Sequence, residues 1–201
     1  MPSRTLAAAA LGAALALGSA IPFGPLGTAY AAASLSSITL KKSDVPAVFR
    51  LTSARADTAQ SAAKNAQVSI ATLRAKGWIG RYAVTYDRSN ASTDAEVTGN
   101  ASLYKSASGA SWDIAHGLSI IKKQFPNAKT FSVSGIGQQA LGVTASGTIQ
   151  RINFSTVFVV FRRGSYVAAA GITLAGKFTA TPSISQVEHY AAIMDGRIKK
   201  G

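Results

Sequence analysis

The stretch VFVVFRRGSYVAAAGI, residues 157–172, constrains the architecture of this chain more than any other segment. Two apolar runs are separated by Arg162, Arg163 and Gly164, and so short a break permits only an antiparallel hairpin, with Gly164 supplying the positive φ of the turn. Neither run alternates between apolar and polar residues, so both faces of the hairpin must be covered. The sequence therefore predicts two interior strands, over residues 152–161 and 165–174, in a sheet with helices on both faces.

The pairing within this hairpin is expected to place large side chains opposite small ones. If Arg163 and Gly164 are the central turn residues, the partners across the ladder are Phe161 with Tyr166, Val159 with Ala168, Phe158 with Ala169 and Val157 with Ala170. The three alanines would then admit a closely packed helix. A helix predicted over residues 183–199 can be that cover, because it carries an amphipathic stripe of Ile184, Val187, Ala191, Met194 and Ile198.

The remaining elements follow from hydrophobic periodicity and turn residues. An alternating run over residues 35–40 predicts a first strand, and apolar residues at three- and four-residue spacing predict helices over 57–76 and 107–124. Asp57 would begin the first of these helices and Gly77 would end it. Further strands are predicted over 80–88, 97–103, 129–134 and 141–145, the first of them with one preferred inner face that carries Tyr82, Val84 and Tyr86.

This order of elements predicts an α+β fold with a mainly antiparallel sheet and helices packed on it, arranged as an α/β/α sandwich. A cystatin-like or NTF2-like α+β fold is the alternative. Residues 32–201 are expected to form one globular domain, since a chain of this length can bury about two-thirds of its unfolded surface around one core.

Residues 1–31 have the features of a secretory signal segment. A short basic start ending at Arg4 precedes an Ala/Leu-rich stretch, and Ala29-Tyr30-Ala31 is a small-x-small cleavage site. Cleavage after Ala20 is an alternative. The sequence thus predicts a secreted, extracytoplasmic protein.

The amino-acid composition excludes several kinds of functional site and indicates the charge of a partner. The chain has no cysteine, which excludes disulfides, thiol nucleophiles and thiolate metal sites. Beyond residue 31 the formal charge is +12, which favours an anionic envelope polymer or lipid surface as partner; the export signal argues against nucleic acid. The candidate ligand-binding residues are the basic doublets Lys122, Lys123, Arg162, Arg163, Lys199 and Lys200. The same doublets are also explained without a ligand, as solvent-exposed residues at helix ends and in a turn. The sequence does not determine the oligomeric state.

Few residues are arranged for catalysis. Asp113 and His116 are three apart on a predicted helix and are the candidate catalytic pair, but two groups alone rarely make a site. No cofactor or metal is predicted. The match of Gly135-x-Gly137-x-x-Ala140 to a dinucleotide fingerprint lacks the following helix and the later acidic residue that this motif needs, so the segment is interpreted as a turn.

Four motifs together resemble a known class of protein. They are L-x3-DVP at residues 40–46, SLYKSASGA at 102–110, GIGQQA at 135–140 and VVFRRGSYVA at 159–168. With the export signal and the closing helix, they resemble small secreted bacterial domains of unknown function with a PsbP/Mog1-like α/β/α sandwich. The resemblance implies that fold and an exported binding role, and supplies no catalytic residues. Where such families carry an acidic residue after the GIG turn, this chain has Gln138 and Gln139.

The predicted function is therefore an exported, non-catalytic binding or accessory domain that associates with the anionic cell envelope or with a soluble ligand. One alternative is a carrier of a small apolar ligand, in which residues 168–170 leave a cavity beneath a helix. The other is a hydrolase that uses His116.

Overall fold

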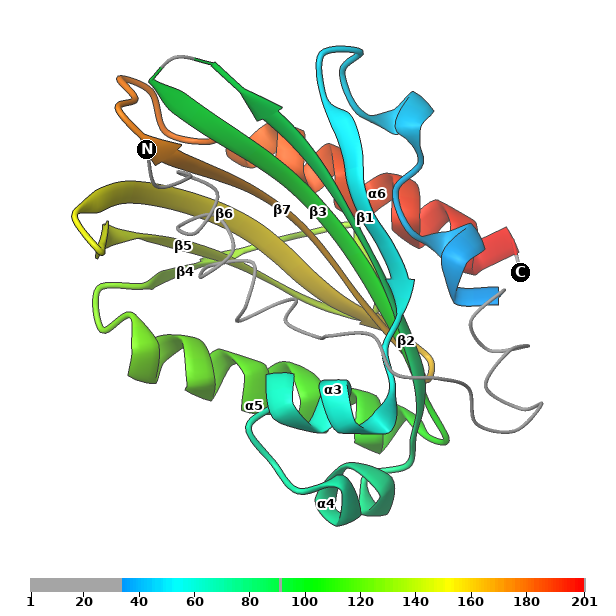
Figure 1. The fold of residues 1–201 in the computed structure, drawn as a ribbon. Helices are drawn as coiled ribbons and strands as arrows, with labels where there is room; N and C mark the ends of the chain where they lie inside the picture. Colours follow the sequence, from blue (N-terminus) through cyan, green and yellow to red (C-terminus); the bar gives the residue numbers. More distant parts are fainter. Residues whose placement is uncertain (1–33, 91, 201) are drawn as a thin grey trace.

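The computed structural model describes residues 34–90 and 92–200; the predicted signal segment and both of its cleavage sites lie outside these residues. From Lys42 onward, twelve elements follow in order (Figure 1): η1 Lys42–Asp44, β1 Arg50–Ala56, α3 Ala59–Asn65, α4 Ile70–Ala75, β2 Trp78–Ser89, β3 Thr93–Tyr104, α5 Ala107–Gln124, β4 Lys129–Ser132, β5 Gln139–Ile149, β6 Ile152–Arg163, β7 Tyr166–Gly176 and α6 Ile184–Lys200.

The seven strands form one antiparallel sheet in the order β1-β2-β3-β7-β6-β5-β4. Two meanders, β1 to β3 and β4 to β7, meet where β3 pairs with β7. Helix α5 packs on β3, β6 and β7 from one side, and α6 packs on β6 and β7 from the other. Figure 1 shows the sheet between these two helices, with α3 and α4 on the α5 side. The predicted α+β fold, with helices on both faces of an antiparallel sheet, is confirmed.

The β6–β7 hairpin is present, but its predicted register was wrong by two residues. Arg163 pairs with Tyr166, so the central turn residues are Gly164 and Ser165, and Gly164 has φ +57°. The observed partners are Phe161 with Ala168, Val159 with Ala170, Phe158 with Gly171 and Val157 with Ile172. A shift of two keeps every side chain on its predicted face, because strand side chains alternate with period two.

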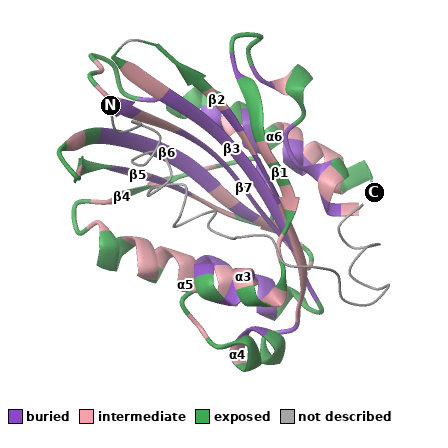
Figure 2. Cartoon of the chain, in the orientation of Figure 1, coloured by how far each residue is buried: buried purple, intermediate pink, exposed green. Residues whose placement is uncertain are grey.

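The core lies mainly between the sheet and α6. Val187, Ala191 and Met194 of α6 are fully buried against Ala168 and Ala170 of β7. Two of the three alanines thus admit the close helix that the sequence predicts, while Ala169 faces α5. Figure 2 shows the buried residues concentrated along β3, β6 and β7.

The first strand was predicted in the wrong place. Residues 34–38 are helical, and the first strand is β1. Leu35 and Ile38, three residues apart, are both buried in the core, and the N–H of Thr39 donates to the Leu35 carbonyl. A spacing that resembled strand alternation was therefore one helical turn. Strand β1 was missed because it is an edge strand without buried residues.

The segment before β1 covers the part of the sheet that α6 leaves open. Leu40 packs over Gly99 of β3, where an added Cβ would lie 2.9 Å from the leucine side chain. The Tyr86 hydroxyl donates to the Leu40 carbonyl at 3.1 Å, and Arg197 of α6 donates to the Thr39 carbonyl at 2.7 Å. These contacts bind the segment to both the sheet and α6.

The helix predicted over residues 57–76 is two short helices, α3 and α4. The chain breaks at Gln67, which has φ +51°, and Ser69 then caps α4 by accepting from the Thr72 N–H. Thr58, not Asp57, caps α3. The Asp57 side chain is instead committed to an ion-pair cluster described below, while Gly77 ends α4 with φ +79° as predicted.

Within the described part of the chain, the helices are too short or too polar to cross a bilayer.

Candidate functional site

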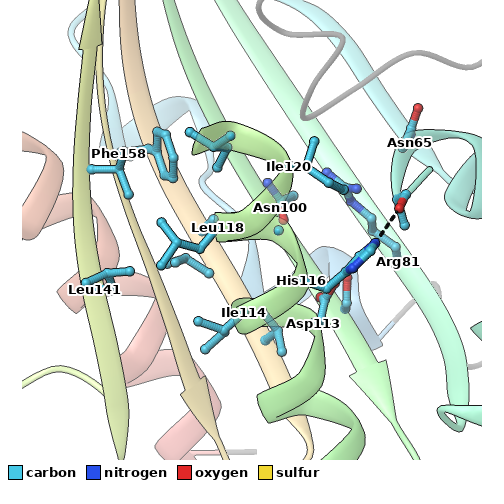
Figure 3. Close-up of a pocket in the computed structure, with 18 residues that line it drawn as sticks. Asn65, Arg81, Asn100, Asp113, Ile114, His116, Leu118, Ile120, Leu141 and Phe158 are labelled. Carbon is cyan, nitrogen blue, oxygen red and sulfur yellow. Dashed lines mark hydrogen bonds between the residues drawn. The ribbon is translucent and has the colours of Figure 1, made fainter. Parts of the chain in front are cut away.

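A cavity of about 100 Å³ lies between α5 and the sheet (Figure 3). Its apolar end is formed by side chains from α5, β5 and β6, among them Leu118, Leu141 and Phe158. Its polar end is formed by Arg81, Asn100 and Asp113 together with neighbouring polar groups. The cavity is therefore amphipathic, with the two chemistries at separate ends as Figure 3 shows.

Two polar side chains of β3 line this cavity without a protein partner. Asn100 and Ser102 are 8% and 4% exposed, and no residue in the described ranges hydrogen-bonds to either side chain. Strand alternation puts them there, because the residues between and beside them, such as Ala101, face α6. Their residues are largely enclosed by protein, while their polar groups open into the cavity, where a ligand or water can bond them.

Arg81 of β2 stands beside these residues and belongs to a buried charge cluster. It pairs with Ser102 across the β2–β3 ladder, and its Nε lies 3.6 Å from the Asp57 carboxylate. The Nε of Arg55 lies at the same distance from Asp57, whose side chain is 2% exposed. On the cavity side, Arg81 acts electrostatically on Asp113. Two guanidinium groups and two carboxyl groups thus balance one another.

Asp113 of α5 is held in low-polarity surroundings. Burial raises its pKa, and the Arg81 guanidinium, the Tyr104 hydroxyl that hydrogen-bonds to it, and His116 only partly offset this. Burial and the nearby carboxyl raise the pKa of Tyr104 in turn. Asp113 and the protonated Tyr104 phenol therefore offer hydrogen-bonding groups to the cavity.

His116 is fixed by its surroundings. Its Nε2 lies 2.7 Å from the Ala66 carbonyl, and its ring stacks on Trp112 with centroids 4.8 Å apart. A carbonyl can only accept, so Nε2 carries the proton and is not free to act as a base. The contact also ties the α3–α4 connection to α5. The structure does bring Asp113 and His116 to the same cavity, but each is engaged with other groups.

The structure does not bring all three basic doublets to one place. Phe125, which follows α5, contacts Phe154 near the start of β6, whereas Arg162 and Arg163 end that strand. Lys122 and Lys123 therefore lie at the opposite end of the sheet from Arg162 and Arg163.

One residue from each of the other two doublets does meet: Arg163 and Lys199 both pair with Asp195 of α6. Arg162 donates to the Gln138 side chain and to the Gly164 carbonyl.

As for metals, no three His, Asp or Glu side chains in residues 34–90 and 92–200 are grouped closely enough to hold an ion.

Sequence reasoning identified Asp113 and His116 but missed Arg81, Asn100 and Ser102. A signal was present: residues 94, 96, 98, 100 and 102 are all polar and alternate with the apolar face of the strand. In a sheet expected to have helices on both faces, such a polar row is a sign of a lined cavity or a buried network.

The scan of protein-family models and the search of curated proteins gave no match to this chain. Among solved structures, the chain is similar to the crystal structure of the extracellular domain of PknH from Mycobacterium tuberculosis, with a TM-score of 0.56 and 11% sequence identity. The likeness covers 84% of this chain and 96% of that one. At this identity it shows the fold alone: this chain has the α+β fold of a bacterial extracellular domain.

Proposed function

We propose that this protein is a non-catalytic, extracytoplasmic binding domain whose cavity beneath α5 holds a small, neutral, amphipathic ligand. The observation that carries the proposal is the pair Asn100 and Ser102, which are more than nine-tenths buried, line the cavity and have no hydrogen-bond partner among the described residues. A ligand with a hydroxyl, carbonyl or amide group would satisfy them.

The charge balance at the polar end favours a neutral head group. Arg81 is flanked by Asp57 and Asp113, and Arg55 is paired with Asp57, so no surplus charge faces the cavity. A buried ionised ligand would have no full counter-charge to offset its desolvation, which costs far more for an ion than for a neutral polar group.

The apolar end and the volume define the rest of the ligand. Leu118, Leu141 and Phe158 offer only hydrocarbon contacts. Since a cavity of ~150 Å³ takes one benzene, the present volume of about 100 Å³ suits a branched group of roughly four to five non-hydrogen atoms. The ligand is either a molecule of that size or the end of a longer one.

The exported location is supported by the signal-like residues 1–31 and by the extracellular nature of the PknH domain that shares the fold. The relation to PsbP/Mog1-like domains and the one-domain organisation stay predictions. Association with an anionic envelope polymer stays a proposal that rests on the net charge. It predicts that the protein co-sediments with envelope fragments and that this binding weakens as salt is added.

The cavity is tested by titrating the full chain with isobutanol and isobutyramide while following methyl resonances of Val160 and Ala169. We expect saturable shifts with a dissociation constant of ~1 mM, which corresponds to a binding free energy of about −4 kcal/mol. Spread over roughly five non-hydrogen atoms, this value lies within the maximum binding free energy per atom that small ligands reach. Isobutyrate, the charged analogue, should bind at least about tenfold more weakly.

A matched pair of glycine variants supplies the control. Gly117 of α5 lines the cavity and Gly196 lies in α6 on the other face, and in both a new Cβ would meet open space. Gly117→Leu should abolish binding and Gly196→Leu should not. Binding that survives Gly117→Leu, or isobutyrate that binds as well as isobutanol, would contradict the proposal.

A further inference from the structure

A groove of about 650 Å³ lies on the other face of the sheet, where the start of α6 meets β4, β5 and β6. Hydroxyl side chains line it from three places: Thr144 and Ser146 of β5, Ser155 of β6, and Ser183 and Ser185 at the start of α6. Ser146 pairs with Ser155 across the ladder, and Thr144 pairs with Val157, whose side chain lies in the core on the α6 side. These β5 and β6 side chains therefore point to the same face as α6.

The start of α6 presents backbone donors to this groove. Ser183 is the N-cap, because its side chain accepts from the Gln186 N–H at 3.2 Å and its carbonyl accepts from Val187. Ile184 and Ser185 are then the first two helical residues, whose N–H groups have no carbonyl within the helix to bond. The 17-residue helix also places the positive end of its dipole here.

A largely buried serine supplies an independent hydrogen-bonding group in the same groove. Ser155 is 6% exposed and lines the groove, and its side chain has no hydrogen-bond partner among residues 34–90 and 92–200. Most of the Ser155 residue is enclosed by protein, while its hydroxyl opens into the groove without a protein partner and can bond a ligand there.

The charge of the lining selects the class of ligand. Lys129 of β4 is the charged residue among the described residues that line the groove, and none of them is acidic or aromatic. A neutral sugar would lack a ring to stack on, whereas an oxyanion would meet an ammonium group, a helix N-terminus and several hydroxyl donors. From these contacts we infer that the groove binds a phosphoryl group, held by Lys129, Ser155 and the N–H groups of Ile184 and Ser185.

The site is tested by titrating inorganic phosphate into the ¹⁵N-labelled full chain at constant ionic strength, with chloride as the balancing anion. The expected result is a saturable shift of the Ile184 and Ser185 amide resonances. Lys129→Gln and Ser155→Ala should each weaken binding by about tenfold, which corresponds to one charge-assisted hydrogen bond. Ser155→Ala removes no hydrogen bond within the described protein, so its thermal midpoint should stay at the wild-type value.

Lys122→Gln is the matched charge control, because it removes one positive charge at the end of α5, on the other face of the sheet. It should leave phosphate binding unchanged. The inference is overturned if the two amides do not respond to phosphate, or if Lys122→Gln weakens binding as much as Lys129→Gln. Neither result bears on the cavity beneath α5, which is tested with different probes.

A second experiment identifies the kind of molecule that carries the phosphoryl group. Phosphatidylglycerol vesicles that sediment the wild-type chain, but not the Lys129→Gln and Ser155→Ala variants, would show that the site takes a lipid headgroup. Phosphate binding without such sedimentation would show a soluble phosphate compound. Both results support a phosphoryl site.

Discussion

Asp195 of α6 accepts two hydrogen bonds from the guanidinium group of Arg163, from Nε at 2.5 Å and from Nη2 at 3.0 Å. The same carboxylate accepts from the Lys199 ammonium at 2.9 Å and from the backbone N–H of Gly137. Its side chain is 2% exposed. The end of the β6–β7 hairpin, the turn before β5 and the last turns of α6 are therefore joined at one buried carboxylate.

Asp195→Asn should lower the free energy of unfolding by about 1.5–3 kcal/mol, the value of hydrogen bonds to a charged group. Urea unfolding at pH 7 measures this. Glu188→Gln on the same helix is the control, since Glu188 makes no ion pair in the described structure, and it should fall within about 0.5 kcal/mol of wild type. Equal effects of the two changes would contradict the role assigned to Asp195.

The Asp195 contribution should also depend on pH. Burial would raise its pKa, but the hydrogen bonds from Arg163, Lys199 and Gly137 outweigh burial and hold the pKa below its usual value of 3.8. The stabilisation is therefore present above about pH 4 and is lost as the pH falls through the lowered pKa of the folded state. The stability difference between wild type and Asp195→Asn should accordingly shrink below pH 4, which unfolding curves at pH 7 and pH 3 would reveal.

Glu96 should give the opposite pH dependence. It is 8% exposed, and burial together with the facing Asp87 raises its pKa from 4.5 to about 8. A raised pKa means that stability is fully present below pH 4.5 and is lost as the pH rises to about 8. Glu96→Gln should thus match wild type at pH 4 and exceed it by a few kcal/mol at pH 9, at about 1.4 kcal/mol per unit of pKa shift. A wild-type stability that stays level over this interval would refute the buried-acid assignment.

Two glycines of α5 should respond oppositely to alanine. A Cβ at Gly109 would lie 2.1 Å from the Lys76 carbonyl oxygen, a backbone atom that cannot move cheaply, whereas a Cβ at Gly117 would meet nothing within 4 Å. Gly109→Ala should therefore destabilise the fold by about 1–3 kcal/mol through overpacking. Gly117→Ala should stabilise it by about 1 kcal/mol through helix propensity. Thermal melts of both variants decide this, and equal signs would show that α5 does not approach Lys76 so closely.

His116 should prove structural. His116→Ala removes its stack on Trp112 and its hydrogen bond to the Ala66 carbonyl, so the unfolding free energy should fall by about 1–2 kcal/mol. His189→Ala, an exposed histidine on α6, is the matched control with an expected change within about 0.5 kcal/mol. A hydrolytic activity that His116→Ala abolishes without loss of stability would instead support the hydrolase alternative.

The sequence by itself determined those elements that its neighbouring residues define. Helix α5 was predicted with the observed bounds because its apolar residues recur at helical spacing, and the structure adds that Ser106 caps it. The β6–β7 hairpin was predicted because Gly164 lies in a short turn between two apolar runs. The faces of β2 followed from the alternation of Tyr82, Val84 and Tyr86, which is local and has a period of two.

The tertiary structure decided what depends on residues distant in the sequence. The hairpin register differs from the local prediction, and the turn that results holds Arg163 against Asp195, thirty-two residues away. The polar end of the cavity is formed by Arg81 and Ser102 from paired strands and by Asp113 from the helix that packs across them. The periodicity of the sequence assigns each residue to a face of its own helix or strand. Which faces meet is determined only by how the helices and strands pack together. The unpartnered side chains of Asn100 and Ser102 are therefore evident only in the tertiary structure.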